Sequence, residues 1–471
     1  MKKIAFSILL AAVMSLTGTR ALAYDMSTTT ADGTIWYNFI NDRTELEVTY
    51  KSEDYNSYSG EVVIPHEVYV YDSYMRVTSI SANAFHSCTG LTSITIPGSV
   101  TNIGNEAFRN CTALTNVNIS SIDAWCNINF GSGISNPINY SHSLILNGEV
   151  IKDLVIPFGV TSIGYKAFEN CSALTSLTIT NGVRSIGNVA FQNCSGLTSV
   201  SIPESVTSIG DNAFDACFSL TSITIPNSVT EIPKSAFAYC RGLTSLTIGS
   251  SVTTIGYWAF DHCSQLTSLT LPESVTKIES YTFRGCDRLK TVTIGSQMQE
   301  IGSYAFTNCD SITKVVSKTV NPPAIYENTF SQSAYSNATL YVPAGTASAY
   351  RAADGWELFT NIVEEGGGNP EPLKCATPTI KLTNGKVHYE CETEDVSYLS
   401  EVAWYPEFEQ SENELVVRVI CTVIVIATKE GYEDSEPAEI TFNLMQAGDV
   451  NGDGEINVSD VTSLVSIILG Q

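Results

Sequence analysis

A cysteine recurs every 23 residues through the middle of this chain, and this regular step limits the folds open to it. Seven cysteines keep the step without interruption, each with a phenylalanine three residues before it: Cys171, Cys194, Cys217, Cys240, Cys263, Cys286 and Cys309. Cys88 and Cys111 are also 23 residues apart. A constant period of this length is typical of solenoids, in which each repeat is one coil stacked on the next. The sequence therefore predicts stacked coils.

Each repeat combines two apolar spacings. Leu220, Ile223 and Ile225 follow the pattern of a short strand that turns one face to the core. Phe214 and Cys217, three residues apart, predict one helical turn with its apolar side inward. A single apolar face can be buried only by stacking neighbouring coils. We therefore expect a mainly β solenoid whose 23-residue repeats each contain a short strand and one helical turn.

The cysteines are predicted to be buried thiols. The chain has 13 of them, an odd number, so they cannot all pair within one molecule. Equivalent side chains on stacked coils point in parallel into the core, which disfavours bridges even at the roughly 4.8 Å spacing of strands. The CxxC and Cys/His spacings of metal sites are absent from the sequence. We expect a column of thiols that pack as small hydrophobic groups.

The repeat also resembles a known family. The pattern S-V-T-x-I-G-x-x-A-F-x-x-C-x-x-L-T-S-x-T-I-P, present from Ser205 to Pro226, resembles the BspA-like leucine-rich repeats of exported proteins from anaerobic bacteria of the gut and mouth. The resemblance covers residues 76–318. It implies a curved, mostly β leucine-rich-repeat solenoid. For several family members it also implies adhesion to host matrix proteins or to other cells.

The regions that flank the repeats predict export and closed solenoid ends. Lys2 and Lys3, the apolar run 4–16 and the small residues around position 23 have the order of a secretory signal peptide, residues 1–23. No later stretch is apolar over the roughly 18 residues that a membrane span requires. We expect a cell-surface or extracellular location, with the periplasm as the alternative. Residues 24–75 and 319–363 are predicted to be an N-terminal β cap and a C-terminal cap.

One coil is predicted to carry an insertion. The step from Cys111 to Cys171 is 60 residues, which places extra chain at about residues 119–153. Within it, Asn147 and Gly148 lie between two short apolar segments and predict a tight hairpin. An insertion of this kind is either a binding feature on one face of the solenoid or a protrusion without a ligand.

Two further modules are predicted after a polar linker at residues 364–371. Residues 372–445 contain predicted strands around 379–382, 386–389, 415–427 and 438–442 and resemble an immunoglobulin-like β-sandwich. Residues 446–471 have the oxygen spacing of a Ca²⁺ loop followed by an amphipathic helix. The candidate ligands are Asp449, Asn451, Asp453, Glu455 through its backbone carbonyl, and Asp460. This piece resembles one half of a type I dockerin, which implies either a cohesin-like partner or packing of the last helix onto the sandwich.

Composition and motifs favour binding over catalysis. The chain has 24 Lys+Arg against 49 Asp+Glu, a formal net charge of −25, which argues against a nucleic-acid partner. Its five histidines are scattered, and no nucleophile–base motif is present in the sequence. We expect a non-catalytic protein that adheres to a host matrix protein, to a host or bacterial surface protein, or to a glycan. The alternative is a component of an extracellular assembly, tethered through the calcium loop.

Three aromatic residues are the candidate binding site. Trp258, Tyr281 and Tyr304 are 23 residues apart and are predicted to stack on three successive coils, with Tyr257 and Tyr239 beside them. Aromatic residues displayed together either anchor a partner or pack on one another. The sequence leaves both roles open.

Overall fold

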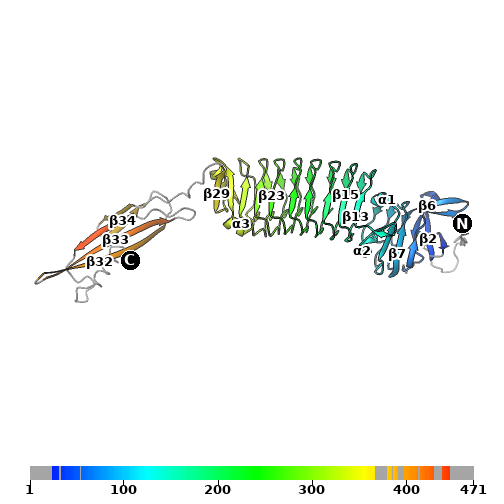
Figure 1. The fold of residues 1–471 in the computed structure, drawn as a ribbon, viewed down its shortest axis with the longest axis horizontal. Helices are drawn as coiled ribbons and strands as arrows, with labels where there is room; N and C mark the ends of the chain where they lie inside the picture. The colour runs from blue at the N-terminus through cyan, green and yellow to red at the C-terminus, as the bar shows by residue number, and fades with distance from the viewer. Residues whose placement is uncertain are drawn as a thin grey trace, which may run out of the picture. The chain divides into compact units, whose positions relative to one another are not determined.

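The structure is a computed structural model that describes residues 24–30, 33–52, 55–365, 379–383, 386–390, 397–411, 414–428 and 438–445 (Figure 1). The chain divides into two compact units, Met1–Gly366 and Gly367–Gln471. The predicted signal peptide and the predicted calcium loop lie outside the described residues. No helix in the described part of the chain is both long and apolar enough to cross a membrane.

The first unit begins with strands that precede the regular repeats. They are β1 (Met26–Thr30), β2 (Gly33–Ile40), β3 (Glu45–Thr49), β4 (Ser59–Val63), β5 (Glu67–Val70) and β6 (Ser73–Ile80), with a 3-10 turn at Asn41–Arg43. The pairings β1–β2 and β2–β3 are antiparallel, whereas β3 pairs with β6 in parallel. Tyr37, Leu46 and Val77 are fully buried. These side chains cover the apolar end that the first coil would otherwise expose.

The next part of the chain contains the insertion. The elements of this part of the chain are β7 (Gly90–Ile96), β8 (Asn102–Ile103), β9 (Asn116–Ile119), α1 (Ile122–Cys126), β10 (Asn129–Phe130), α2 (Ile138–Ser141), β11 (Ile145–Leu146) and β12 (Glu149–Val150). β11 and β12 pair antiparallel around Asn147 and Gly148, which confirms the predicted hairpin. Trp125 of α1 lies in the core, and its Nε1–H donates to the carbonyl of Ala167 at 2.6 Å. Much of the insertion therefore fills the solenoid instead of projecting from it.

The regular coils build two rows of parallel strands in register. The longer strands are β13 (Asp153–Ile156), β15 (Ser176–Ile179), β17 (Ser199–Ser201), β19 (Ser222–Thr224), β21 (Ser245–Thr247), β23 (Ser268–Thr270), β25 (Thr291–Ile294) and β27 (Lys314–Ser317). The two-residue strands are β14 (Ser162–Ile163), β16 (Ser185–Ile186), β18 (Ser208–Ile209), β20 (Glu231–Ile232), β22 (Thr254–Ile255), β24 (Lys277–Ile278) and β26 (Glu300–Ile301). Each row is divided once, between β21 and β23 in one row and between β18 and β20 in the other. Partners such as Ser176 and Ser199 are one repeat apart, which confirms the mainly β solenoid of 23-residue repeats.

The ladder of two-residue strands is interrupted between β18 and β20, and Pro233 gives a physical reason. In most coils the equivalent residue is glycine, whose N–H donates to an isoleucine carbonyl of the preceding coil. Gly256 donates in this way to Ile232 at 2.8 Å. Proline has no backbone N–H, so the carbonyl of Ile209 cannot receive this bond from Pro233.

The segment that carries the repeated phenylalanine and cysteine is a run of tight turns, so the predicted helical turn is wrong. The N–H of Cys171 donates to the carbonyl of Phe168, three residues earlier, at 3.1 Å. Lys166 and Asn170 have φ values of 62° and 64°. Left-handed backbone at these two positions prevents a continuous right-handed helix. The spacing of three between the apolar residues fits both structures, because the hydrogen bond of each tight turn also joins residues three apart.

The repeated phenylalanines form one stack in the core. Successive rings from Phe168 to Phe330 are buried, with centroids 4.9–5.5 Å apart and planes within 10° of parallel. The rings thus bury one another's faces from coil to coil. Each coil therefore depends on its neighbours to bury its phenylalanine.

The repeated cysteines are free, buried thiols throughout the described residues, as predicted. From Cys194 to Cys309, each repeated thiol donates to the phenylalanine carbonyl of the preceding coil. Cys194 Sγ lies 3.2 Å from the Phe168 carbonyl, and Cys240 Sγ lies 3.4 Å from that of Phe214. Burial raises the pKa of Cys171 to about 12, so its thiol stays protonated at neutral pH. Cysteine fits here because it is small, apolar and a weak donor.

The first unit ends with α3 (Gln332–Asn337), β28 (Thr339–Pro343), α4 (Ala347–Arg351) and β29 (Asn361–Glu365). Tyr350, Trp356 and Phe359 are buried, and Trp356 Nε1 donates to the carbonyl of Pro323 at 2.8 Å. Phe359 and Trp356 contact Phe330, the last ring of the stack. These aromatic side chains cover the far end of the core.

The second unit contains strands in two antiparallel groups. β30 (Thr379–Thr383) pairs with β31 (Lys386–Glu390), and β33 (Glu414–Thr428) pairs with both β32 (Ser397–Ser411) and β34 (Ala438–Met445). The four strands predicted from the sequence are confirmed, and β32 is an addition to them. Packing of the two groups into an immunoglobulin-like sandwich stays a prediction.

Candidate binding surface

Trp258, Tyr281 and Tyr304 form one column on three successive coils. The rings of Trp258 and Tyr281 are 5.5 Å apart at 17°, and those of Tyr281 and Tyr304 are 4.9 Å apart at 9°. Tyr304 is 38% exposed, so the column reaches the solvent. The predicted stacking is confirmed. Its binding role stays a prediction.

These three residues occupy a costly backbone conformation. Their φ values are 56°, 65° and 60°. The same position is left-handed in other coils, where smaller or more flexible residues predominate: Asn83, Glu106, Lys166, Val189, Asn212 and Ser235. Left-handed backbone costs a non-glycine residue roughly 1–3 kcal/mol, and bulky side chains are the rarest there. Three aromatic residues in a row at this position therefore indicate a role for their side chains.

The two flanking tyrosines lie in different places. Tyr257 contacts Trp258 at 5.9 Å, and a hydrogen bond with the Glu279 carboxylate raises the pKa of its hydroxyl. Tyr239 stacks instead on His262, at 5.0 Å and 9°, and forms a second column. We call these six aromatic residues the aromatic ridge: Trp258, Tyr281, Tyr304, Tyr257, Tyr239 and His262.

An ion pair between the buried Asp261 carboxylate and the partly exposed Arg284 guanidinium lies beside both columns. Arg284 donates from Nε and Nη2 to the Asp261 carboxylate at 2.9 and 2.8 Å, and its guanidinium carbon is 5.3 Å from the Tyr281 ring centroid. These bonds raise the pKa of Arg284. His262 Nδ1 is 2.9 Å from Asp261 Oδ1. Sequence reasoning missed His262 and this pair, although the 23-residue steps from Tyr239 to His262 and from Asp261 to Arg284 were available signals.

Two further cations border the ridge. Lys234 Nζ lies 5.3 Å from the Trp258 ring, and the Arg241 guanidinium lies 5.8 Å from Tyr239 and 5.4 Å from the exposed Phe218. Within the described residues neither cation has a carboxylate in ion-pair contact. The ridge therefore offers free positive charge on a chain whose net charge is −25. Cations over aromatic rings also hold those rings in place.

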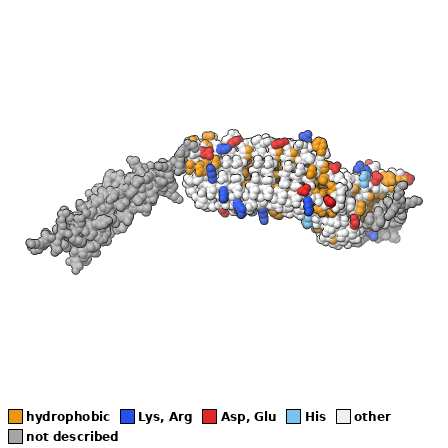
Figure 2. Space-filling view, viewed as in Figure 1, with side chains coloured by type: hydrophobic (Ala, Val, Ile, Leu, Met, Phe, Trp, Pro, Cys, Tyr) orange, Lys and Arg blue, Asp and Glu red, His pale blue; other side chains and the backbone are white. Residues whose placement is uncertain are grey.

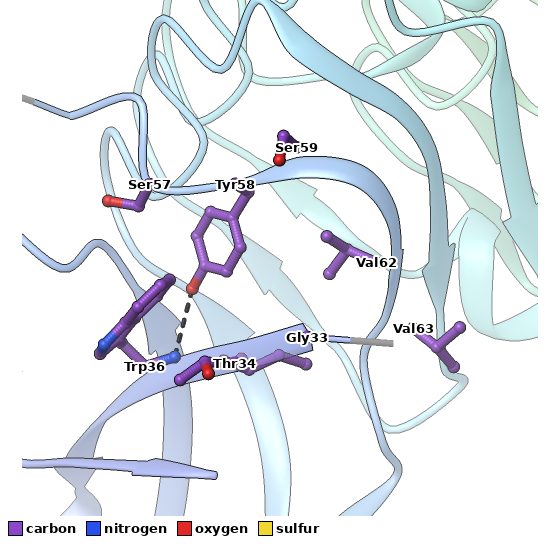
Figure 3. A pocket seen from close by; sticks show the side chains of 9 residues that line it. Gly33, Thr34, Trp36, Ser57, Tyr58, Ser59, Val62 and Val63 are labelled. Carbon is purple, nitrogen blue, oxygen red and sulfur yellow. Dashed lines mark hydrogen bonds between the residues drawn. The ribbon is translucent and has the colours of Figure 1, made fainter. Parts of the chain in front are cut away.

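A small pocket lies elsewhere, between the start of β2 and residues 57–63, which include β4 (Figure 3). Its volume is about 190 Å³, below the roughly 300–1,000 Å³ of small-molecule sites. The Tyr58 hydroxyl accepts from the Trp36 N–H at 3.3 Å and donates to the Thr49 carbonyl at 2.5 Å. Burial raises the pKa of Tyr58 well above its usual value. Both hydrogen bonds join segments of the N-terminal strands, so this hydroxyl has a structural role.

Metal binding has no site in the described ranges of the chain. They contain no group of three His, Cys, Asp or Glu side chains placed to hold an ion. The predicted ligands Asp449, Asn451, Asp453, Glu455 and Asp460 all lie outside the described residues.

Several solved structures are similar to this chain. A leucine-rich cell surface protein from Faecalibacterium prausnitzii is 24% identical, with 62% of this chain and 94% of that chain covered and a TM-score of 0.33. A leucine-rich repeat protein from Bacteroides ovatus is 25% identical over 60% and 92%, with a TM-score of 0.27. The pneumococcal vaccine antigen PcpA is 16% identical over 73% and 99%, with a TM-score of 0.37. No curated protein matches the chain.

The family comparison agrees with the repeat geometry. The BspA type leucine-rich repeat region matches in six copies, over residues 72–132, 145–267 and 256–345. These ranges cover more than half of the 471 residues and contain the Phe and Cys columns and the aromatic ridge. The chain belongs to the BspA-type leucine-rich repeat family.

Proposed function

We propose that this protein is an exported, non-catalytic binding protein, located at the cell surface or outside the cell. It adheres through the aromatic ridge to a protein of the host matrix or of another cell surface. The observation that carries this proposal is the run of three stacked aromatic residues at left-handed positions, beside unpaired cations. The free-energy cost of the left-handed backbone at these residues is offset if their side chains contribute to the binding of a partner.

The ring geometry favours a protein partner over a glycan. Sugars pack on the faces of aromatic rings, but the faces of Tyr281 are covered by Trp258 and Tyr304. Lys234 lies over Trp258. What the column presents is a series of ring edges and polar tips. Rigid amphipathic side chains of this kind are the common anchors of protein interfaces.

The proposal predicts that replacing Trp258, Tyr281 and Tyr304 together by alanine weakens partner binding about 100-fold. One central aromatic anchor contributes about 2 kcal/mol or more, which is about 30-fold, and the losses from rings that contact one another add only in part. Binding of the mature protein to purified matrix proteins and to intact host cells is measured by surface plasmon resonance and flow cytometry. Circular dichroism checks that the solenoid is folded.

A matched variant replaces three exposed tyrosines away from the ridge, Tyr71, Tyr74 and Tyr165. We expect it to bind as the unmodified protein does. Equal affinity of the ridge variant and the unmodified protein would remove the ridge as the site. Equal loss in both variants would point to a nonspecific aromatic effect.

We also propose that residues 446–471 bind Ca²⁺. This piece either tethers the protein to a larger extracellular assembly or packs its last helix onto residues 372–445. The support is the spacing of the oxygen ligands in the sequence. Isothermal titration with Ca²⁺ is expected to show one site, which Asp449→Ala with Asp453→Ala abolishes. An unchanged titration in that variant would contradict the assignment. Capture of a cohesin-bearing protein that EGTA reverses would identify the tether.

A further inference from the structure

The regular coils provide an internal comparison for each surface position, because equivalent residues are 23 apart. In the view of Figure 2, most of the solenoid face carries side chains that are neither charged nor hydrophobic. Arg241 departs from this background, since the equivalent residues of other coils include Ser172, Ser195 and Ser264. Phe218, one repeat before Arg241, occupies the same position. The stacking of coils does not require either residue, so both point to a role outside the fold.

The Arg241 guanidinium lies over two aromatic rings. Its carbon atom is 5.4 Å from the ring centroid of Phe218 and 5.8 Å from that of Tyr239. Arg241 and Phe218 are both exposed, so this group of side chains stands at the surface. Aromatic rings attract a guanidinium and hold it in place. Less side-chain freedom is then lost when a partner binds to it.

The N–H groups of this guanidinium are free to bind a partner. Within the described residues, the Arg241 side chain makes no hydrogen bond and no ion pair. Arg109 and Arg284, in contrast, each donate twice to a carboxylate of this chain. A guanidinium has donors and no acceptor, and its planar fork matches a carboxylate. Arg241 therefore offers a carboxylate site that the chain itself leaves open.

Lys234 supplies a second cation from the same coil. It is exposed, and its Nζ lies 5.3 Å from the Trp258 ring, so a cation lies over a ring of each aromatic column. The acidic residues at equivalent positions are Asp211, one repeat before Lys234, and Asp287, two repeats after Arg241. In the part of the chain that the structure describes, neither forms an ion pair with these cations. The two positive charges therefore remain available at the ridge.

The net charge of −25 does not prevent a local anionic contact. Exposed charges separated by more than about 10 Å are largely screened at an ionic strength of about 0.1 M. A long polyanion would meet the acidic residues of the rest of the chain, whereas a short acidic segment meets mainly the cations of the ridge. The ring edges beside those cations favour apolar side chains on the same segment.

We propose that the partner contacts the aromatic ridge with a protein segment that carries acidic side chains beside apolar ones. Carboxylates of this segment bind Arg241 and Lys234, and its apolar side chains pack on Phe218 and on the ring edges of the two columns. This inference rests on the proposed function, because it names the chemistry of the partner at the same surface.

The test uses a phage-displayed library of random peptides, selected on the mature protein. We expect the selected peptides to be enriched in Asp and Glu next to apolar residues. Their affinity, measured by fluorescence anisotropy, is expected to fall about tenfold in the double variant Lys234→Gln, Arg241→Gln. It is also expected to fall in the variant with alanine at Trp258, Tyr281 and Tyr304. Binding to the unmodified protein should weaken as NaCl is added, because salt screens exposed charges.

The matched control is the double variant Arg184→Gln, Lys290→Gln, which removes two exposed cations outside the ridge and should leave the affinity unchanged. Peptides that depend on the three aromatic residues but lack acidic enrichment, or that bind the Lys234→Gln, Arg241→Gln variant equally well, overturn the inference and leave the proposed function standing. If no selected peptide depends on the aromatic residues, the proposed function is contradicted and the inference with it. Binding of heparin through the two cations, without acidic peptides, would assign them to a sulfated glycan and also overturn the inference.

Discussion

Replacing Phe237 by alanine is expected to lower the free energy of unfolding of the repeat unit by about 3–5 kcal/mol. Phe237 is fully buried, and its ring lies 5.3 Å from that of Phe214 and 5.5 Å from that of Phe260. Alanine leaves a cavity that rigid neighbouring coils cannot fill. The measurement is urea unfolding of the mature protein, followed by circular dichroism.

The control is Phe218→Ala, because Phe218 is 42% exposed and contacts the Arg241 guanidinium on the surface. We expect this change to cost less than about 1 kcal/mol, mainly a cation–π contact. Equal losses at Phe218 and Phe237 would show that the stack contributes nothing beyond general hydrophobicity. In a solenoid each coil contacts only its neighbours, so Phe237→Ala should also broaden the transition by uncoupling the two halves.

The core of the solenoid was predictable because its period is a property of the sequence. The 23-residue step places Phe168 above Phe191 and Trp258 above Tyr281 before any coordinates are known, and both stacks are present. The hairpin at Asn147 and Gly148 was predictable for a local reason. Both residues tolerate positive φ, and both adopt it.

Other features depend on geometry that spacing alone does not contain. Tyr239 was expected beside Trp258, but it lies at a different turn position and stacks on His262. The helical turn was expected because three-residue spacing fits both a helix and successive turns. Only the positive φ at positions such as Asn170 separates the two. The start of a new sheet at β13 depends on how the insertion ends, which apolar patterns do not encode.

Replacing Arg284 by alanine is expected to destabilise the repeat unit by about 3–5 kcal/mol. The Asp261 side chain is only 2% exposed, and both of its carboxylate oxygens accept hydrogen bonds from the Arg284 guanidinium. Without the guanidinium, the buried Asp261 carboxylate keeps, among the described residues, only the contact with His262 Nδ1, at 2.9 Å, to offset its charge. Thermal and urea unfolding at pH 7 measure the loss. Loss of the cation beside Tyr281 should also weaken partner binding at the aromatic ridge.

Two further variants test whether the buried charge is the cause. Arg109→Ala breaks a pair with Glu106 whose side chains are 50% and 38% exposed, and is expected to cost less than about 1 kcal/mol. Adding Asp261→Asn to Arg284→Ala removes the stranded charge and should recover most of the lost stability. If the double variant is as unstable as Arg284→Ala alone, the arginine acts through packing on Tyr281 and not through the carboxylate. The contrast between Asp261 and Glu106 thus assigns the effect to burial, because both carboxylates accept from an arginine at similar distances.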